Sequence, residues 1–125
     1  MPAIHRIRLR GPWDIVAEHD QGTILIPSNL RDGGYPDLRG TISLYRRFGR
    51  PTNLNAHDEV RLVIEGVVGE AKATLNSVEL GPIDQTASFA VHALLNDRNV
   101  LRIDLEATDA DCGLLGEVRL EIHTR

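Results

Sequence analysis

The segment from Val60 to Gly81 alternates apolar and polar residues with a period of two. The alternation runs through residues 60–65 and, after two glycines, resumes through residues 71–76. Half-buried antiparallel strands show this pattern because successive side chains point to opposite faces of a sheet. Asn76-Ser77 ends the second run, and asparagine tolerates the positive φ of a two-residue turn. The segment therefore predicts two facing strands and a tight hairpin to a third, short strand. The residues that the period places on the inner face are Val60, Leu62, Ile64, Ala71, Ala73 and Leu75.

The same period recurs along most of the chain and predicts an all-β fold. About ten short strands follow one another at close spacing, which is typical of an antiparallel β-sandwich or jelly roll. Helical period is limited to a single turn at residues 93–95. A chain of residues 1–125 is long enough for a single domain with one hydrophobic core. Trp13, Phe48 and Phe89 are expected in that core. Besides the central segment, the expected strands are residues 4–10, 13–18, 22–26, 41–48, 87–91, 99–106 and 118–123.

Residues 4–10 combine a strand pattern with a row of arginines. Ile7 and Leu9 are expected on the inner face, and the arginines are expected on the opposite face. A row of arginines can bind anions, but a run of charge along one face of a strand usually marks its solvent-exposed side. We expect the solvent-exposed side here.

The expected strand at residues 41–48 contains a conflict at Arg46. Ile42, Leu44 and Phe48 share one face, and strict alternation also turns Arg46 to that face. A buried guanidinium needs a partner. We therefore expect either that Arg46 pairs with an acid such as Glu65 or that a bulge bends the strand and turns the side chain outward.

Charge and cysteine content exclude several classes of protein. The net charge of −4 disfavours a general nucleic-acid binder, because phosphate binding needs clustered positive charge. Cys112 is the single cysteine, so no internal disulfide and no zinc site are expected. No apolar run approaches the ~20 residues that span a bilayer, and residues 1–10 lack the apolar stretch of a signal peptide. We expect a soluble, cytoplasmic protein, unless a leader has been removed, without cofactor or metal.

Residues 28–40 are predicted to form the longest surface loop and are the first place to look for binding residues. Tyr35 either projects from this loop toward a ligand or folds back over the core with its hydroxyl bonded locally, and the second arrangement is the more common one. Two acidic groups elsewhere, residues 57–59 and the pair Asp109 and Asp111, are interpreted as polar turns, not as cation sites.

A series of short motifs extends along nearly the whole chain. The motifs are Gly11-Pro12-Trp13, Gly40 to Phe48 with the run Tyr45-Arg46-Arg47-Phe48, Pro51, Val60-x-Leu62, Glu65-Gly66-Val67, Ala71-x-Ala73-x-Leu75-Asn76, Leu80-Gly81, Phe89, Leu94-Leu95, Asn99-x-Leu101-x-Ile103 and Gly116-x-Val118-x-Leu120. In this order they resemble the N-terminal sugar-binding domain of glycoside hydrolase family 2, the class of β-galactosidases and β-glucuronidases. The resemblance implies a jelly roll of the galactose-binding-domain-like type.

The resemblance also bears on activity. In that family the catalytic carboxylates lie in a separate (β/α)₈ barrel, with acid and nucleophile at a fixed separation. Here one jelly roll accounts for the whole sequence, and no pair of carboxylates is placed by the sequence as acid and base. We expect no enzymatic activity. Two segments depart from the family pattern: Ser77 replaces a frequent glycine, and residues 82–88 lack an aromatic, glycine-rich stretch.

Two functions remain open. The first is a non-catalytic carbohydrate-binding module, because aromatic faces and planar polar side chains hold sugars. In this interpretation, replacing Tyr35 by alanine abolishes binding. The second is a protein–protein interaction or self-association module without a sugar ligand, which uses a sheet face or edge of mixed charge. The residues expected to bind a sugar are Tyr35 and Tyr45 as platforms and Arg31, Asp32, Asp37, Arg39 and Arg47, with Arg46 beside them, as the polar set.

Overall fold

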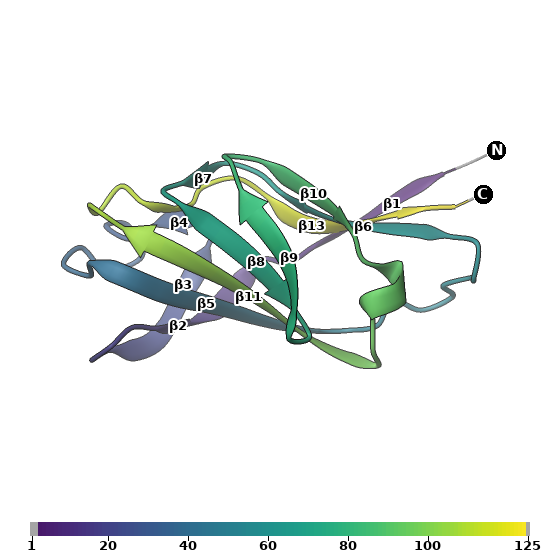
Figure 1. Ribbon diagram of the computed structural model, residues 1–125, viewed down its shortest axis with the longest axis horizontal. Coiled ribbons are helices and arrows are strands. Elements are labelled where there is room, and N and C mark those ends of the chain that lie inside the picture. Colours follow the sequence, from purple (N-terminus) through teal and green to yellow (C-terminus); the bar gives the residue numbers. More distant parts are fainter. Residues whose placement is uncertain (1–2, 125) are drawn as a thin grey trace.

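The computed structural model describes residues 3–124 and shows an antiparallel β-sandwich (Figure 1). Its elements within these residues are β1 (Ile4–Arg8), β2 (Gly11–Val16), β3 (Gln21–Ile26), β4 (Ser28–Asn29), β5 (Gly40–Gly49), β6 (Glu59–Ile64), β7 (Val67–Val68), β8 (Ala71–Leu75), β9 (Val78–Ile83), β10 (Ala87–Ala90), the 3₁₀ turn η1 (His92–Leu94), β11 (Arg98–Ala107), β12 (Gly113–Leu114) and β13 (Val118–His123). One layer is a six-stranded sheet in the order β3-β2-β5-β11-β8-β9. The other layer contains a four-stranded sheet, β1-β13-β6-β10, and a small three-stranded sheet, β4-β12-β7. The predicted all-β antiparallel sandwich is confirmed.

The two smaller sheets meet where their strands break at a pair of glycines. β6 leads into β7 through Glu65-Gly66, and β12 leads into β13 through residues 115–117. A Cβ atom on Gly66 would lie 2.5 Å from the backbone nitrogen of Gly116. Only glycines allow two backbones to pass this closely, and β12 then pairs with both β4 and β7.

The core lies between the two layers and confirms the alternation of the central segment. β6 and β8 belong to opposite layers, as expected for facing strands. Trp13 is also fully buried, and its indole N–H donates to the carbonyl of Leu9 over 3.0 Å. Phe48 and Phe89 are half-buried and pack against the core. The fully buried inner residues of the central segment are Val60, Leu62, Ile64, Ala73 and Leu75, while Ala71 is half-buried.

The predicted hairpin after residue 75 is present between β8 and β9. Asn76 and Ser77 both adopt positive φ, 51° and 69°. Two successive residues in this region form the type of turn whose twist matches that of the flanking strands. The single helical turn predicted near residues 93–95 is η1. In the described part of the chain, no helix is long and apolar enough to cross a membrane.

The structure shows Arg46 in neither of the two expected arrangements, a pair with Glu65 or a bulge. β5 pairs with β11 in unbroken register, so the expected bulge is absent. Glu65 binds Arg119, so it is not the partner either. Instead, the Nε atom of Arg46 donates to the carbonyl of Arg10 over 3.1 Å, and its Nη1 atom donates to the carbonyl of Arg47. Backbone carbonyls therefore satisfy this half-buried guanidinium in place of a carboxylate.

β1 corrects one further expectation. All five of its residues are exposed, including Ile7 at 39%, so Ile7 does not join the core as predicted. Leu9, just beyond the strand, is buried as expected. The reason is position: β1 is the edge strand of its sheet and pairs only with β13. The predicted solvated face of arginines is confirmed.

Candidate functional site

The outer face of the six-stranded sheet carries polar side chains in rows that cross its central strands. Inward residues alternate with them, since Leu101, Ile103 and Leu105 of β11 are fully buried. Pairing of β5 with β11 places three pairs opposite each other: Thr41 with Glu106, Ser43 with Asp104 and Tyr45 with Arg102. The adjacent strands add Lys72 opposite Asp104 and Asp14 opposite Tyr45. We call the surface of Asp14, Thr41, Ser43, Tyr45, Arg47, Lys72, Arg102, Asp104 and Glu106 the polar sheet face.

Hydrogen bonds across the strands fix the acidic side chains of this face. The hydroxyl of Ser43 donates to Asp104 over 2.7 Å, and the hydroxyl of Thr41 donates to Glu106. The Nε atom of Arg102 is shielded from solvent and lies 3.3 Å from Asp104 Oδ2, yet it makes no hydrogen bond to the described residues. Arg102 is thus paired through Nε with a carboxylate that is already held in place, while its side chain as a whole is 40% exposed.

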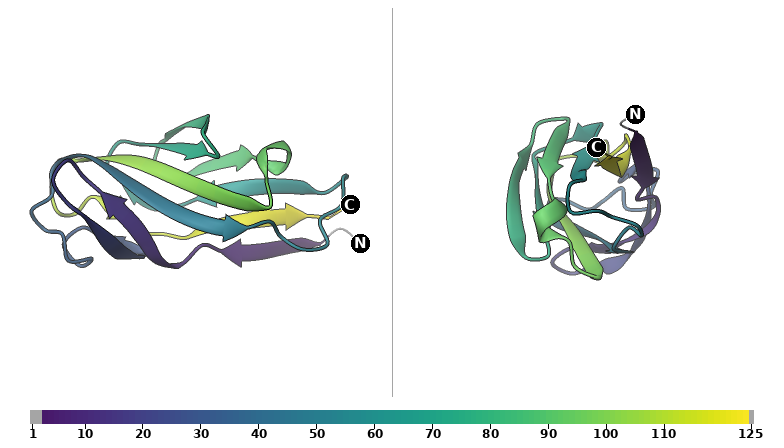
Figure 2. Two further views of the ribbon diagram at one scale, coloured as in Figure 1. Left: turned by 90° about the horizontal axis from the view of Figure 1, so that it is seen from below. Right: turned by 90° about the vertical axis from the view of Figure 1, so that its right-hand side faces the viewer.

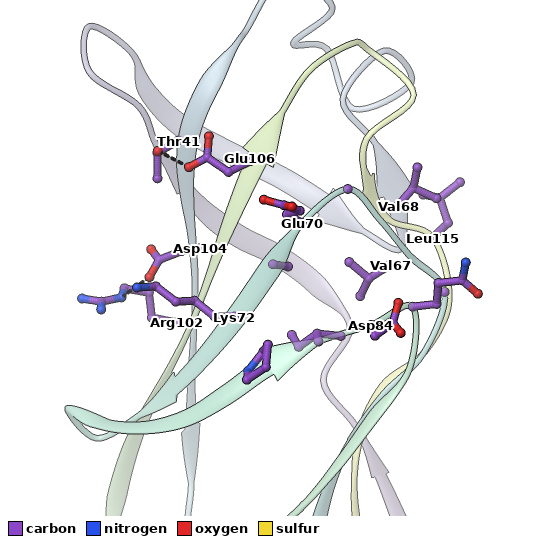
Figure 3. Close-up of a pocket in the computed structure, with 16 residues that line it drawn as sticks. Thr41, Val67, Val68, Glu70, Lys72, Asp84, Arg102, Asp104, Glu106 and Leu115 are labelled. Carbon is purple, nitrogen blue, oxygen red and sulfur yellow. Dashed lines mark hydrogen bonds and ion pairs between the residues drawn. The ribbon is translucent and has the colours of Figure 1, made fainter.

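A groove of about 1290 Å³ opens beside these rows (Figure 3). Its polar side is formed by residues of β5, β8 and β11, and Figure 3 shows Thr41 turned toward Glu106 there. Its other end is apolar, with Val68 and Leu115 exposed at 43% and 45%. Lys72 and Arg102 are its two cationic residues, and Glu70, Asp84, Asp104 and Glu106 are its acidic ones. The groove therefore offers hydrogen-bond donors and acceptors along one side and apolar surface at one end.

Two of the predicted site residues lie on this face. Tyr45 and Arg47 both line a second, smaller hollow of about 560 Å³ with Asp14 and Thr23. Arg47 Nη1 donates to Asp14 Oδ2 over 2.8 Å. Strand pairing therefore places Tyr45 between Asp14, which is ion-paired with Arg47, and Arg102 in one row across the sheet.

The predicted residues of the loop at 28–40 are not brought together with that face. Arg31 binds Asp111, and this hydrogen bond raises the pKa of Arg31 above its ordinary value. The backbone N–H of Asp32 donates to the side chain of Asn29 over 2.7 Å. Arg39 donates to the carbonyls of residues 36 and 38 over 2.9 and 2.7 Å. Asp37 is exposed.

Tyr35 lies on the core side of β3, opposite in direction to Tyr45. Its ring packs against the core, and its hydroxyl donates to the carbonyl of Thr23 over 2.9 Å. A Cβ atom on Gly22, which pairs with the buried Ile15, would lie 2.3 Å from that hydroxyl. The structure thus shows the folded-back arrangement of Tyr35. The ring and the hydroxyl of Tyr35 both make contacts within the fold, and the two expected platforms, Tyr35 and Tyr45, do not share a surface.

The acidic side chains of the two predicted polar turns accept hydrogen bonds from backbone N–H groups. Asp58 accepts from the N–H of Asn55 over 3.0 Å, and Asp109 accepts from the N–H of Asp111 over 2.8 Å. Within residues 3–124, no group of three or more His, Cys, Asp or Glu side chains is arranged to hold a metal ion. The interpretation of these acids as turn residues agrees with their hydrogen bonds.

Arg102, Asp104, Glu106, Lys72 and Thr41 were not identified as site residues from the sequence. Alternation in residues 99–106 does place the first three on the polar side of a strand. What the sequence lacks is the pairing of β11 with β5 and β8. Pairing with β5 brings together residues as distant in sequence as Ser43 and Asp104, which are 61 positions apart. Long-range pairing of this kind has no local signal.

Comparison with known proteins gives a structural match without a sequence match. No protein-family model matches the chain, and no curated protein matches its sequence. The β-D-glucuronidase of Dictyoglomus thermophilum superposes with a TM-score of 0.81 at 13% identity over 98% of this chain and 28% of that chain. A β-glucuronidase from an uncultured Clostridium sp. gives a TM-score of 0.81 at 16% identity, over 98% of this chain and 30% of its own. A β-glucuronidase from glycoside hydrolase family 2 gives 0.77 at 15% identity, over 95% and 18%. The chain has the fold of a domain found in family 2 glycoside hydrolases.

The fold implied by the sequence resemblance is thereby confirmed. At identities of 11% to 19%, the match establishes architecture and carries no residue of a site from one protein to another. This chain spans 18% to 32% of the length of the matched β-glucuronidases. Most of the length of each matched enzyme therefore lies outside the superposed part.

Proposed function

We propose that this chain is a carbohydrate-binding module without a catalytic role of its own, and that it binds sugar on the polar sheet face and in the adjoining groove. The observation that carries the proposal is the composition of the groove. Planar polar side chains lie at every second position along one side, and exposed apolar side chains lie at one end. Sugars present hydroxyls and apolar C–H faces together, so they match a surface of this kind.

Individual side chains can be given roles on this basis. The guanidinium of Arg102, whose side chain is 40% exposed, and the carboxylates of Asp104 and Glu106 supply donors and acceptors for hydroxyls. Tyr45 offers the face of its ring beside Arg102 for the C–H surface of a sugar. The hydroxyls of Ser43 and Thr41 hold the two carboxylates before ligand arrives, which reduces the entropy lost on binding. The similarity of the fold to part of several β-glucuronidases is consistent with a sugar ligand.

The test is a glycan-binding screen, followed by titration calorimetry with any oligosaccharide that binds. Uronic-acid, neutral and amino sugars are all included. Arg102→Ala and Tyr45→Ala are expected to weaken binding at least about tenfold, or roughly 1.4 kcal/mol. Arg39→Ala is the matched control, because it also removes one exposed arginine but lies on the loop at 28–40 and donates only to nearby carbonyls.

Each outcome has a distinct meaning. Loss of affinity in Arg102→Ala with none in Arg39→Ala supports the polar sheet face. The reverse result places the sugar on the loop at 28–40 and contradicts the assigned site. A protein that binds no glycan in the screen contradicts carbohydrate binding itself.

A further inference from the structure

The edges of the two main sheets differ in how far they are protected from pairing with another strand. At one edge of the six-stranded sheet, β9 contains Pro82, which lacks an N–H, and its register with β8 shifts between Ala73 and Thr74. At the other edge, the hydroxyl of Tyr35 occupies the carbonyl of Thr23 on β3. Such devices keep edge strands from pairing with other chains. On the four-stranded sheet, β10 is only 4 residues long.

Within the described residues, β1 is protected against pairing by the charge of Arg6 and Arg8 and by none of the devices named above. It pairs with β13 in unbroken register over all 5 of its residues, contains neither proline nor glycine, and is exposed along its whole length. It lies at the margin of the molecule beside β13 (Figure 2). The structure shows no other strand against its outer edge in residues 3–124.

The free hydrogen-bonding groups of β1 can be assigned from its ends. The N–H of Leu9 donates to the carbonyl of Val118, and the N–H of Thr124 donates to the carbonyl of Ala3. In an antiparallel ladder, residues alternate between groups directed at the partner strand and groups directed away from it. Odd-numbered residues of β1 therefore bond to β13, while Ile4, Arg6 and Arg8 present their N–H and C=O groups to the free edge.

The side chains along this edge are basic. Arg6 and Arg8 both have side chains that are 55% exposed. The Nε atom of Arg8 donates to Glu117 over 2.7 Å, and Arg6 lies 3.8 Å from Glu121, whose shorter contact of 2.8 Å is with Arg119. Both guanidinium groups therefore keep donors for another carboxylate. On the opposite face of β1, the exposed Ile7 would pack against an apolar residue of any strand that is added to this edge.

We propose that β1 is a strand-addition site for an acidic, extended segment of another protein. A second copy of this chain fits less well, because antiparallel pairing of two β1 strands over their full length sets Arg6 opposite Arg6, and like charges directly opposite are destabilising. Strand addition derives affinity from main-chain hydrogen bonds and specificity from alternate side chains. A partner with glutamate or aspartate at alternate positions faces the arginines, and its apolar residues cover Ile7. This surface is separate from the polar sheet face, so the inference does not depend on sugar binding.

The experiment uses a short capped peptide in which glutamate alternates with valine, and a matched peptide in which lysine replaces glutamate. Binding is measured by fluorescence anisotropy, and backbone amide exchange is followed by NMR. We expect the acidic peptide to bind at least about tenfold tighter than the basic one. It should slow exchange of the N–H groups of Ile4, Arg6 and Arg8, while His5 and Ile7 are already protected by β13.

Two variants of Arg6 separate the contribution of its charged side chain to binding from that of its backbone N–H group. Arg6→Ala removes the guanidinium but keeps the free N–H, so binding weakens and the exchange pattern persists. Arg6→Pro also removes the N–H, which β13 does not use, and proline is tolerated where an edge strand faces solvent. Binding should then be lost. Should Arg6→Pro fail to fold, the double variant Arg6→Glu, Arg8→Glu keeps the backbone and should reverse the preference toward the basic peptide.

Three results overturn the inference. One is a wild-type protein that binds neither peptide or shows no preference between them. Another is equal binding by the folded Arg6→Pro and Arg6→Ala variants. The third is a concentration-dependent dimer, detected by light scattering, that Arg6→Pro abolishes, because the occupant of the edge is then a second copy.

Discussion

At the scale of single residues, glycines permit a very close backbone approach between Gly66 and Gly116. Gly66 has a φ of +68°, and any Cβ atom there would lie 2.5 Å from the nitrogen and 2.8 Å from the Cα of Gly116. Gly34 also has positive φ, +95°, but no atom lies within 4 Å of the position of its Cβ. The two glycines share a backbone conformation that side chains disfavour and differ in the space around it.

Alanine at these two positions should therefore have unequal effects. Gly34→Ala is expected to lower the free energy of unfolding by about 1–2 kcal/mol, the cost of left-handed backbone for an alanine. Gly66→Ala should exceed that by about 1–3 kcal/mol, because the strands must also move apart. Urea denaturation of both variants measures the difference. Equal losses in the free energy of unfolding would show that the backbones at Gly66 and Gly116 can move apart without further cost.

Asn99 and Asn76 form a second constraint at this scale. Asn99 is 1% exposed, and its Oδ1 accepts from the side chain of Asn76 and the backbone of Asn96, each over 2.8 Å. Its Nδ2 donates to the carbonyls of Asn96 and Phe48. Asn76 Oδ1 accepts in turn from the N–H of Val100. The hairpin after β8 is thereby tied to the start of β11.

Asn99→Ala is expected to destabilise the protein by roughly 3 kcal/mol, because it leaves several shielded donors and acceptors without partners. Ser77→Gly, in the same hairpin, is the control. Ser77 has a φ of 69°, so glycine should be neutral or stabilising by about 1 kcal/mol. Thermal unfolding followed by circular dichroism compares the two. A loss smaller than about 1 kcal/mol for Asn99→Ala would mean that water replaces the network.

Sequence reasoning succeeds for residues whose role is set by local period and fails for those whose role is set by a distant partner. The turn at Asn76 follows from its tolerance of positive φ, yet nothing local indicates that its side chain binds Asn99. Arg46 shows the same limit. Its inward position follows from alternation, but its partners are carbonyls of Arg10 and Arg47. Backbone acceptors are present at every position and so leave no mark on the sequence.

At the scale of elements, β13 carries a ladder of ion pairs on its outer face. Arg119 contacts Glu65, Glu117 and Glu121, and Glu121 also contacts His123 over 3.2 Å. The hydrogen bond from Arg119 lowers the pKa of Glu121 below its ordinary value of 4.5, although burial acts in the opposite direction. Burial disfavours the charged form of Arg119, but the hydrogen bonds and the negative charges of Glu65 and Glu121 together outweigh burial and raise the pKa of Arg119.

The lowered pKa of Glu121 predicts a dependence of stability on pH. A carboxylate whose pKa is lower in the folded state stabilises the fold fully above its ordinary value, 4.5, and loses that contribution as the pH falls through the lowered value. Glu121→Gln should therefore be less stable than wild type at neutral pH, and the difference should shrink as the solution is acidified below 4.5. Urea unfolding at a series of pH values measures this. Glu18→Gln, on an exposed turn, is the control, and a pH-independent difference for Glu121→Gln would contradict the linkage.

The long strands were predictable, and the shortest ones were not. β5, β6, β11 and β13 each follow from alternation over 6 or more residues. β4, β7 and β12 contain 2 residues each, too few to show a period. They pair where glycines let backbones approach closely, at Gly66 beside Gly116 and at Gly113 beside Asn29. Edge position is equally invisible in a pattern, which is why Ile7 was expected in the core.

At the scale of the whole molecule, the sequence resemblance and the structural match agree on the fold and leave the site open. Motif residues such as Gly66, Asn76 and Gly116 occupy turns and close contacts, so they indicate the fold and not a binding site. The polar sheet face depends on the order of β2, β5, β11 and β8 across one sheet. That order is a property of the assembled sandwich, and it separates Tyr45 from Tyr35, which the sequence had grouped as two sugar platforms.

This separation makes stability and ligand binding independently testable. A ligand that binds only the folded state stabilises it by about 2.7 kcal/mol at one hundred times its Kd, which raises Tm by several degrees. Tyr35→Phe loses the bond to Thr23, so the Tm without sugar should fall, by about 1 kcal/mol of stability, while the shift caused by sugar remains. Arg102→Ala should leave the Tm without sugar nearly unchanged, because its side chain is 40% exposed and ion pairs near the surface contribute little, yet it should lose the shift. If Tyr35→Phe loses the shift of Tm caused by sugar and Arg102→Ala keeps it, the sugar binds at the loop at 28–40. The expected pattern instead shows that Tyr35 stabilises the fold and that Arg102 binds the ligand.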